Sequence, residues 1–412
     1  MQKSIIRVPC RGIFGALAIA AALILSAPAR ADNANVTVYG QANVSYDMIN
    51  TGTASGIGAS AGVSSSRVSS NSSRLGLKGS NELGSGWSAL WQMEATVGAD
   101  TGATGSAGTI AGASARSTRL FDRDTYLGVS NAGWGKLLAG RHDTPYKMST
   151  RRLDVFADGI ADNRSLMGTT VLGGVVTETF DTRLSNQISY LSPDLGGFSI
   201  AIGYVNLAES NTDASQDDVS SLSVAGMYEQ DPVYVSFAYE AHNTTLKETS
   251  TAAKAVKIGA GYKLGILDLG FAYEKSTDEL GNMDPYDADP NSAGYNPCGG
   301  MAVAANCSGH GTMYFSAKLS ITEADAFKLA YSRAGQVGEA STGTGAIQFS
   351  MGIDHKINER TTVYGLYTSL KNDKLAEYGL SNAASSGVYS VNTSGAGGAS
   401  PSAFSFGLRH SF

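Results

Sequence analysis

The amino-acid sequence predicts an all-β protein, a sixteen-stranded antiparallel β-barrel that crosses a membrane. Segments of about ten residues alternate apolar and polar side chains, so that each strand has one face of either kind. The connections between them are short and long in turn, as in a chain of hairpins. Fifty glycines, 9 prolines and only 16% charged residues suit a strand-rich chain with many turns.

The N-terminal segment 1–31 is expected to be a cleaved secretory signal peptide, which leaves 32–412 as the barrel domain. Basic residues precede an apolar run at 13–25, and an Ala-x-Ala cleavage site follows at 29–31. That run is too short for a membrane-spanning helix, which needs about 20 residues. Without this segment the net charge falls from −6 to about −10, because four basic residues are lost. An acidic chain disfavours nucleic acid as a partner.

The alternation is clearest in the last strand, where Phe404, Phe406 and Leu408 alternate with Ser405 and Gly407. The sixteen predicted strands lie near 36–48, 72–81, 87–99, 122–131, 135–143, 183–192, 198–208, 218–230, 233–241, 253–264, 266–274, 310–321, 326–333, 346–357, 361–370 and 403–412. A bilayer cannot satisfy an open sheet edge, so the first strand must pair with the last. The alternative, a soluble β-sandwich, would have to bury all sixteen apolar faces.

Aromatic residues on the apolar faces support a membrane barrel, because rings at headgroup level form girdles around such proteins. The rings assigned to these faces are Tyr190, Phe198, Tyr204, Tyr228, Tyr239, Tyr262, Tyr273, Tyr314, Tyr331, Tyr364 and Phe412.

One long connection, 144–181, has no sustained alternation but many apolar residues. Connections longer than about 12–15 residues without structure of their own are usually functional or disordered. Asp154, Asp158 and Asp162 recur every four residues, which would place their carboxylates on one face of a short helix. We expect the barrel to form a wall around this segment.

Cys298 and Cys307 are a close pair in a polar, glycine-rich segment. In an oxidising compartment they are expected to form a small surface-loop disulfide. No second Cys/His pair lies near them, so neither a metal nor a cofactor is expected. The five histidines are scattered and no Ser–His pair stands out, which argues against an enzyme.

Several motifs resemble those of Gram-negative general diffusion porins, in particular the betaproteobacterial, neisserial-type branch. They occur in family order as 73–79 (SRLGLKG), 82–87 (ELGSGW), 122–129 (DRDTYLGV), 140–145 (GRHDTP), 186–193 (NQISYLSP) and 407–412 (GLRHSF). The resemblance implies short periplasmic turns, long extracellular loops, and a third long loop, 144–181, folded into the pore. It also implies a homotrimer in the outer membrane, among lipid and lipopolysaccharide, whose terminal Phe412 is read by the barrel assembly machinery.

The charged residues on the polar faces of the strands predict the position of a pore constriction. Strand parity turns Arg74, Lys78 and Glu94 toward the lumen, and the resemblance places Arg141 there. The three aspartates of 144–181 would face them. A narrow slot with cations on the wall and acids on the loop has a strong transverse field. In the alternative, these charges only pair with each other and fix the loop to the wall. Arg123 shares the parity of outward-facing residues and is placed at a rim.

We therefore predict a passive outer-membrane channel for ions and small hydrophilic solutes. One alternative is a substrate-specific porin for small anions, and another is a structural or adhesive barrel. Tyr39, Tyr126 and Tyr234 are only scattered along the predicted lumen faces, unlike the aromatic run of specific sugar pores. Arginine on the wall favours a mild anion preference, because its guanidinium stays charged and binds oxyanions in a fixed fork. The alternative is a nearly neutral selectivity, since the acids of the internal segment offset these cations.

Overall fold

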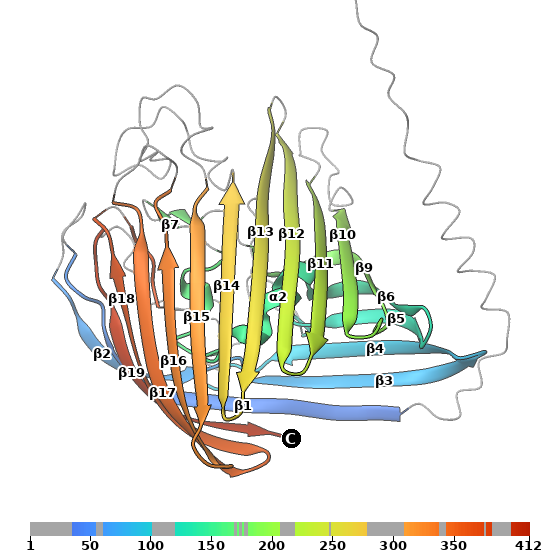
Figure 1. The fold of residues 1–412 in the computed structure, drawn as a ribbon, viewed down its shortest axis with the longest axis horizontal. Coiled ribbons are helices and arrows are strands. Elements are labelled where there is room, and N and C mark those ends of the chain that lie inside the picture. The colour runs from blue at the N-terminus through green and yellow to red at the C-terminus, as the bar shows by residue number, and fades with distance from the viewer. Residues whose placement is uncertain are drawn as a thin grey trace, which may run out of the picture.

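The computed structural model shows a closed antiparallel barrel with a compact segment inside it (Figure 1). The residues that it describes are 35–54, 61–100, 120–168, 171–172, 175–176, 180–206, 219–246, 249–277, 309–337, 343–374, 376–380 and 397–412. Within these ranges no helix is long and apolar enough to cross a bilayer.

The barrel strands agree closely with the predicted segments. Their bounds are β1 (Asn35–Asn50), β2 (Ser64–Ser70), β3 (Arg74–Gly84), β4 (Trp87–Thr96), β5 (Thr125–Asn131), β6 (Gly135–Asp143), β9 (Arg183–Leu191), β10 (Phe198–Asn206), β11 (Val219–Gln230), β12 (Val233–Leu246), β13 (Thr249–Leu264), β14 (Leu267–Thr277), β15 (Gly311–Ser320), β16 (Asp325–Ala334), β17 (Ala346–Asn358), β18 (Thr361–Asn372) and β19 (Ser402–Ser411).

The barrel closes between its first and last strands. The β1–β19 register runs from Gln41 opposite Ser411 to Asn50 opposite Ser402. On its other side β1 pairs with both β2 and β3. These two strands are therefore halves of one strand position, and the 17 strands of the sheet fill sixteen positions. The predicted sixteen-stranded barrel is confirmed.

The second strand position differs from its prediction, which covered only 72–81. The chain already joins the sheet at β2, a serine-rich run in which a single valine leaves little alternation to detect. Between the halves, Ser72 adopts a positive φ of 53°. The Ser73 hydroxyl there accepts a hydrogen bond from the Asn43 amide and donates one to the Asn43 carbonyl. This side chain takes the place of ladder bonds at the interruption.

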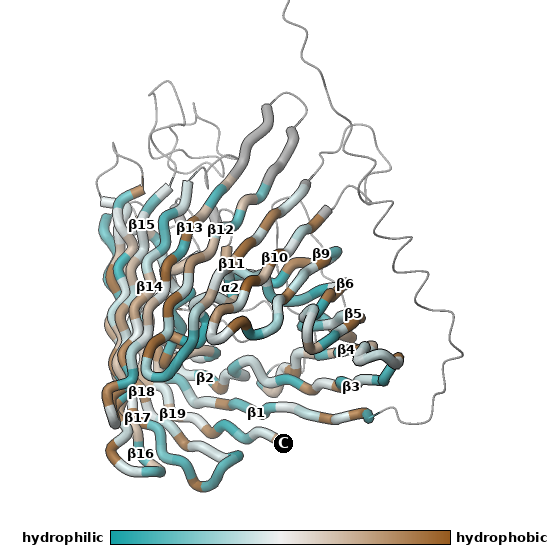
Figure 2. The backbone as a smooth tube through the Cα atoms, turned by 45° about the vertical axis from the view of Figure 1, so that its right-hand side comes forward, coloured by the Kyte–Doolittle hydropathy of each residue, from teal (hydrophilic) through white to brown (hydrophobic). Residues whose placement is uncertain are grey.

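The two faces of the wall have opposite character, as predicted. Phe198, Phe237 and Phe406 on the outer face are each more than half exposed. Inward-facing Ser223 and Ser236 are buried beneath the internal residues. Figure 2 shows hydrophobic and hydrophilic positions alternating along the strands. A sandwich would bury its apolar faces, so the exposed aromatic outer surface excludes that alternative.

The prediction of an outward orientation is wrong for two aromatic residues, because Tyr314 and Tyr364 point into the barrel. The Tyr314 hydroxyl donates to Asp154 at 2.9 Å, and that of Tyr364 donates to Asn43 at 2.9 Å. In β15 the outward ring is that of Phe315, one residue further on. A phenol fits a polar lumen because its hydroxyl finds an acceptor there.

The internal segment, 144–181, begins with α2 (Pro145–Thr150), behind β11–β13 in Figure 1. The Thr144 hydroxyl accepts from the Lys147 amide as an N-cap, and Pro145 suits the first helical position. Further along are η2 (Arg151–Leu153), η3 (Asn163–Ser165) and the short pair β7 (Val171–Leu172) and β8 (Val175–Val176). Helix α2 packs against the inner faces of β11, β12 and β13.

The predicted helix carrying the acid row is absent from the described residues, because 154–162 forms turns. The Asp154 carboxylate accepts from the amides of Phe156 and Asn163, at 2.9 and 3.0 Å. Asp162 accepts from the Arg164 amide and caps η3, while Asp158 has a positive φ of 64°. Aspartate side chains that bond local amides in this way compete with helix formation.

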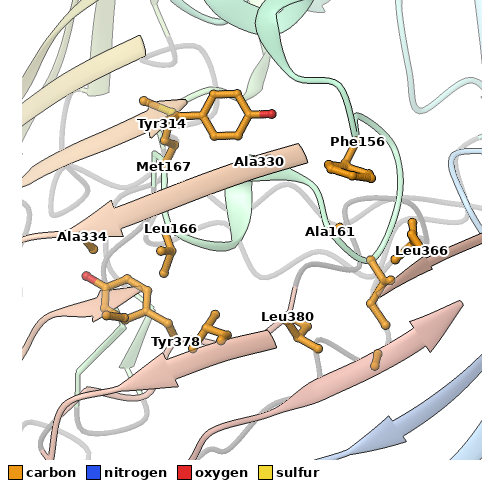
Figure 3. Packing of buried hydrophobic residues seen from close by; sticks show 14 of the residues in the cluster. Phe156, Ala161, Leu166, Met167, Tyr314, Ala330, Ala334, Leu366, Tyr378 and Leu380 are labelled. Atoms are coloured by element: carbon orange, nitrogen blue, oxygen red, sulfur yellow. The ribbon is translucent and has the colours of Figure 1, made fainter. Parts of the chain in front are cut away.

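A second stretch also enters the barrel, after β18. The Asn372 side chain donates to the carbonyls of Tyr378 and Ala399 and accepts from the Tyr378 amide. This clamp directs Tyr378 and Leu380 into the cluster that holds Leu166 (Figure 3). All three side chains are fully buried. The internal segment thus packs its apolar side against β15–β19 and leaves its charged side toward β3–β9.

Candidate functional site

The charged side of the internal segment is organised around Arg151. Its guanidinium lies 2.6 Å from Asp162, 2.9 Å from Asp158 and 3.4 Å from Asp154. Arg164 adds a second contact to Asp162 at 3.0 Å. The three predicted acids are therefore together, although not on a helix. Both arginines were missed by sequence reasoning, which had no way to know that the turn at Asp158 folds the chain back onto Arg151.

One predicted contact between wall and segment is present. Arg74, at the start of β3, lies 3.5 Å from Asp158 and 3.9 Å from Glu94 of β4. Glu94 also accepts from Arg123 and, at 2.9 Å, from the Tyr39 hydroxyl. Arg123 was expected at a rim, but it precedes β5, where strand parity does not apply. The two arginines offset the charge of Glu94.

Lys78 and Arg141 lie on either side of this group. The Lys78 ammonium sits 5.1 Å from the centre of the Tyr39 ring. Arg141 donates to the carbonyls of Asp122 and Arg183, at 2.7 and 3.1 Å, and stays half-buried. Arg183, a further cation that sequence reasoning missed, contacts Asp124 and lies 2.8 Å from Asp143. Within the predicted strand 183–192 it shares the parity of the polar Ser185 and Gln187, so strand parity could have identified it.

Asp154 contacts β15 and helps to fix the internal segment to that part of the wall. It is buried and accepts from the Tyr314 hydroxyl of β15. Burial and the negative charge of Asp162 raise the pKa of Asp154 to about 6. For Asp162, burial acts in the same direction, but the charges of Arg151 and Arg164 prevail and hold its pKa well below the usual range. The two carboxyl groups around Arg151 thus titrate far apart.

A buried ion pair ties both ends of the internal segment to the wall. Lys257 of β13 lies 3.2 Å from Glu274 of β14 and 2.6 Å from Asp181. Glu274 accepts from the Tyr146 hydroxyl and from the Gly168 amide, each at 2.7 Å. Tyr146 lies near the beginning of the internal segment, and Asp181 is its last residue. The anchor therefore converges on two neighbouring strands.

On the charged side of the internal segment and on the wall that it faces, positive and negative side chains nearly balance. The cations are Arg74, Lys78, Arg123, Arg141, Lys147, Arg151, Arg164 and Arg183, and the acids are Glu94, Asp122, Asp124, Asp143, Asp154, Asp158 and Asp162. The excess is one positive charge. Most of these groups are paired, so the alternative of charges that fix the segment in place also holds for part of them.

Two further predicted sites have different outcomes. Cys298 and Cys307 lie outside the described residues. Phe412 exchanges backbone hydrogen bonds with Gly40 of β1, at 3.0 and 3.1 Å. Its ring lies against the Gly40 backbone, where a Cβ would come within 2.4 Å of it. The terminal aromatic thus takes part in closing the sheet.

Comparisons with known proteins agree with this architecture. A family model described as Gram-negative porin matches residues 16–375. An outer membrane porin protein of Bordetella pertussis is 24% identical over 332 residues, which are 77% of this chain and 82% of that protein. Outer membrane porin protein 32 of Delftia acidovorans is 25% identical over 399 residues, covering 96% and 99% of the two chains.

Solved structures share the fold. The anion-selective porin from Comamonas acidovorans superposes with a TM-score of 0.69 at 22% identity, over 92% of this chain and all of that one. OmpT of Vibrio cholerae in its trimer form gives a TM-score of 0.59 at 13% identity, with the same coverage.

Proposed function

Because the chain belongs to the family of Gram-negative porins, we infer that it is a passive channel of the outer membrane for ions and small hydrophilic solutes. The observation that carries this inference is the internal segment. It is tied across the inside of a closed barrel by Lys257 and Glu274, and its charged side faces the charged wall of β3–β9. Family and fold point to a channel rather than an enzyme.

Planar-bilayer recording tests this function. We expect purified, refolded protein to produce stepwise conductance without any added energy source. A structural or adhesive barrel, the alternative from another class, would have a plugged lumen and give no solute flux in liposome swelling.

We further propose that Arg74, Lys78, Glu94, Arg141, Asp158 and Asp162 line the narrowest part of the pore, and that Asp154 anchors the segment behind it. The close approach of Arg74 to Asp158 supports this placement. Arg151, Arg164 and Arg123 join the set because they contact the same acids. Arg183, which pairs with Asp124 and Asp143 beside them, is added as a neighbouring cation.

A mild anion preference is proposed for this constriction, since cations exceed acids by one among the charged side chains of the segment and the wall that it faces. Replacing Arg74 with alanine is expected to lower anion permeability and to raise cation permeability, each by up to about fivefold, because a unit charge about 4 Å from a passing ion contributes about 1 kcal/mol in water. Reversal potentials in a potassium chloride gradient measure the shift. Arg360→Ala, in an exposed turn, serves as the control. A wild-type preference for potassium, or an unmoved potential in Arg74→Ala, contradicts this assignment.

The selectivity is also expected to change with pH. As pH falls through about 6, Asp154 takes up a proton, and one negative charge directly behind the constriction is lost. Anion permeability relative to cation permeability should therefore rise below pH 6 and level off above it. The Asp154→Asn variant removes the titrating group and should lose this step. If the step persists in that variant, another group is responsible for it.

The remaining proposals concern assembly and processing. We propose a homotrimer, a state in which OmpT of Vibrio cholerae has been solved; the mass of the unheated protein in detergent tests it. We also propose cleavage after residue 31, a Cys298–Cys307 disulfide, contact with lipopolysaccharide, and recognition of Phe412 by the barrel assembly machinery. N-terminal sequencing and mass analysis before and after reduction test the first two.

A further inference from the structure

Beneath the internal segment, at the end of the barrel with the short turns, lies a cavity of about 510 Å³. Its roof is the part of the segment from Arg152 to Ala157, and its wall is the inner face of β11–β19. The cavity lies on the side of the segment that faces the short turns. A solute that enters from the long loops therefore meets it after the constriction.

Charged side chains on this wall follow one another across neighbouring strands. Lys263 is opposite Asp268, and Asp268 is opposite Lys318 on the next strand. Lys318 in turn is opposite Lys328. Asp354 then lies 2.8 Å from Lys328 and 3.7 Å from Arg409. From Lys263 to Arg409 the row therefore holds four cations and two acids. This wall has an excess of two positive charges.

The other end of the cavity is negative. Glu229 at the end of β11 and Asp231 in the following turn line it, and Glu229 is paired with Arg152. Asp154 contributes a further carboxyl from the roof. Five cations and five acids line the cavity altogether, which makes it neutral in sum and polarised along its length. Among the described residues, neither Lys263 nor Asp231 has an ion-pair partner.

We propose that this cavity is a binding station for small zwitterionic solutes, in the size class of a free α-amino acid. The proposal rests on the channel function. The carboxylate of the solute would point to Lys263 and Lys318 and its ammonium group to Asp231. An ion of either sign meets repulsion at one end of such a cavity, while a dipole is stabilised at both ends. The volume leaves room for the solute together with its water.

The test compares two isomers, free alanine and lactamide, which have the same atoms but differ in that only alanine is a zwitterion. Tracer flux into liposomes is measured for each over a range of concentrations. Alanine flux is expected to saturate, because the solute occupies a site, while lactamide flux stays linear. Linear alanine flux beside normal lactamide flux overturns the binding station alone. Absence of lactamide flux overturns the channel and the station with it.

Variants locate the site. Lys263→Gln and Asp231→Asn should each raise the half-saturating alanine concentration by about threefold, the weight of one partly screened charge contact. The double variant should raise it by about tenfold, since the two groups contact opposite ends of the solute. Lys356→Gln is the matched control, because this exposed lysine of β17 does not line the cavity. Equal effects of Lys356→Gln and Lys263→Gln would place the binding elsewhere and overturn the assignment.

Discussion

Replacing Lys257 with methionine is expected to release the internal segment from the wall. The ammonium group lies between Asp181 and Glu274 with no exposed surface, so its removal leaves two buried carboxylates facing each other. Removing one partner of a buried ion pair costs about 3–5 kcal/mol. We expect larger and noisier conductance steps in planar-bilayer recording. In gel electrophoresis of samples heated in detergent, the band of the folded protein should convert to that of the unfolded protein at a lower temperature.

Two further variants separate loss of charge balance from loss of packing. In Lys257→Met combined with Asp181→Asn and Glu274→Gln, no uncompensated charge remains, and quiet conductance should largely return. Lys254→Met is the matched control, because this residue of the same strand is exposed. Quiet steps of wild-type size in the single Lys257→Met variant would show that the ion pair does not hold the segment.

Arg151→Gln is expected to have the second large effect. The substitution removes the group shared by Asp154, Asp158 and Asp162. Because these acids are largely buried, we expect a loss of about 3–5 kcal/mol in the stability of the segment. The proposed constriction also loses a positive charge, so the reversal potential should move toward cation preference. Bilayer recording and thermal unfolding in detergent measure the two consequences.

The neighbouring arginine provides the comparison. Arg152 is 46% exposed and pairs with Glu229, which is 59% exposed. Exposed ion pairs contribute about 0–1 kcal/mol, so Arg152→Gln should leave thermal stability nearly unchanged. Equal destabilisation by both substitutions would contradict the special position of Arg151.

The barrel could be predicted from the sequence because strand alternation is a local property. Phe404, Phe406 and Leu408 indicate their outward face without any knowledge of their neighbours. Alternation does not identify a strand where it is weak, as in Ser64–Ser70, and it gives the wrong face where an aromatic ring belongs to the inner side of the wall. Tyr314 was misassigned because its contact partner, Asp154, is far away in sequence.

The candidate site was only partly predictable for the same reason. Arg74 and Glu94 sit on regular strands, and parity directed both of them correctly inward. Arg123 and Arg151 lie outside strands, so their directions depend on turns that no periodicity describes. The acid row of the segment was identified from its spacing, but the spacing suggested a helix where local aspartate–amide bonds impose turns.

The pairing of β1 with β19 also has a consequence for folding. Gln41 finds its partner only when Ser411 is present, near the end of the chain. Until then the growing sheet keeps two unpaired edges, each a template for association with other chains. Contacts between such distant positions form slowly, because a long loop must close first. We therefore expect the chain to need protection from aggregation during its transit to the membrane, and closure of the barrel to be a late step of folding.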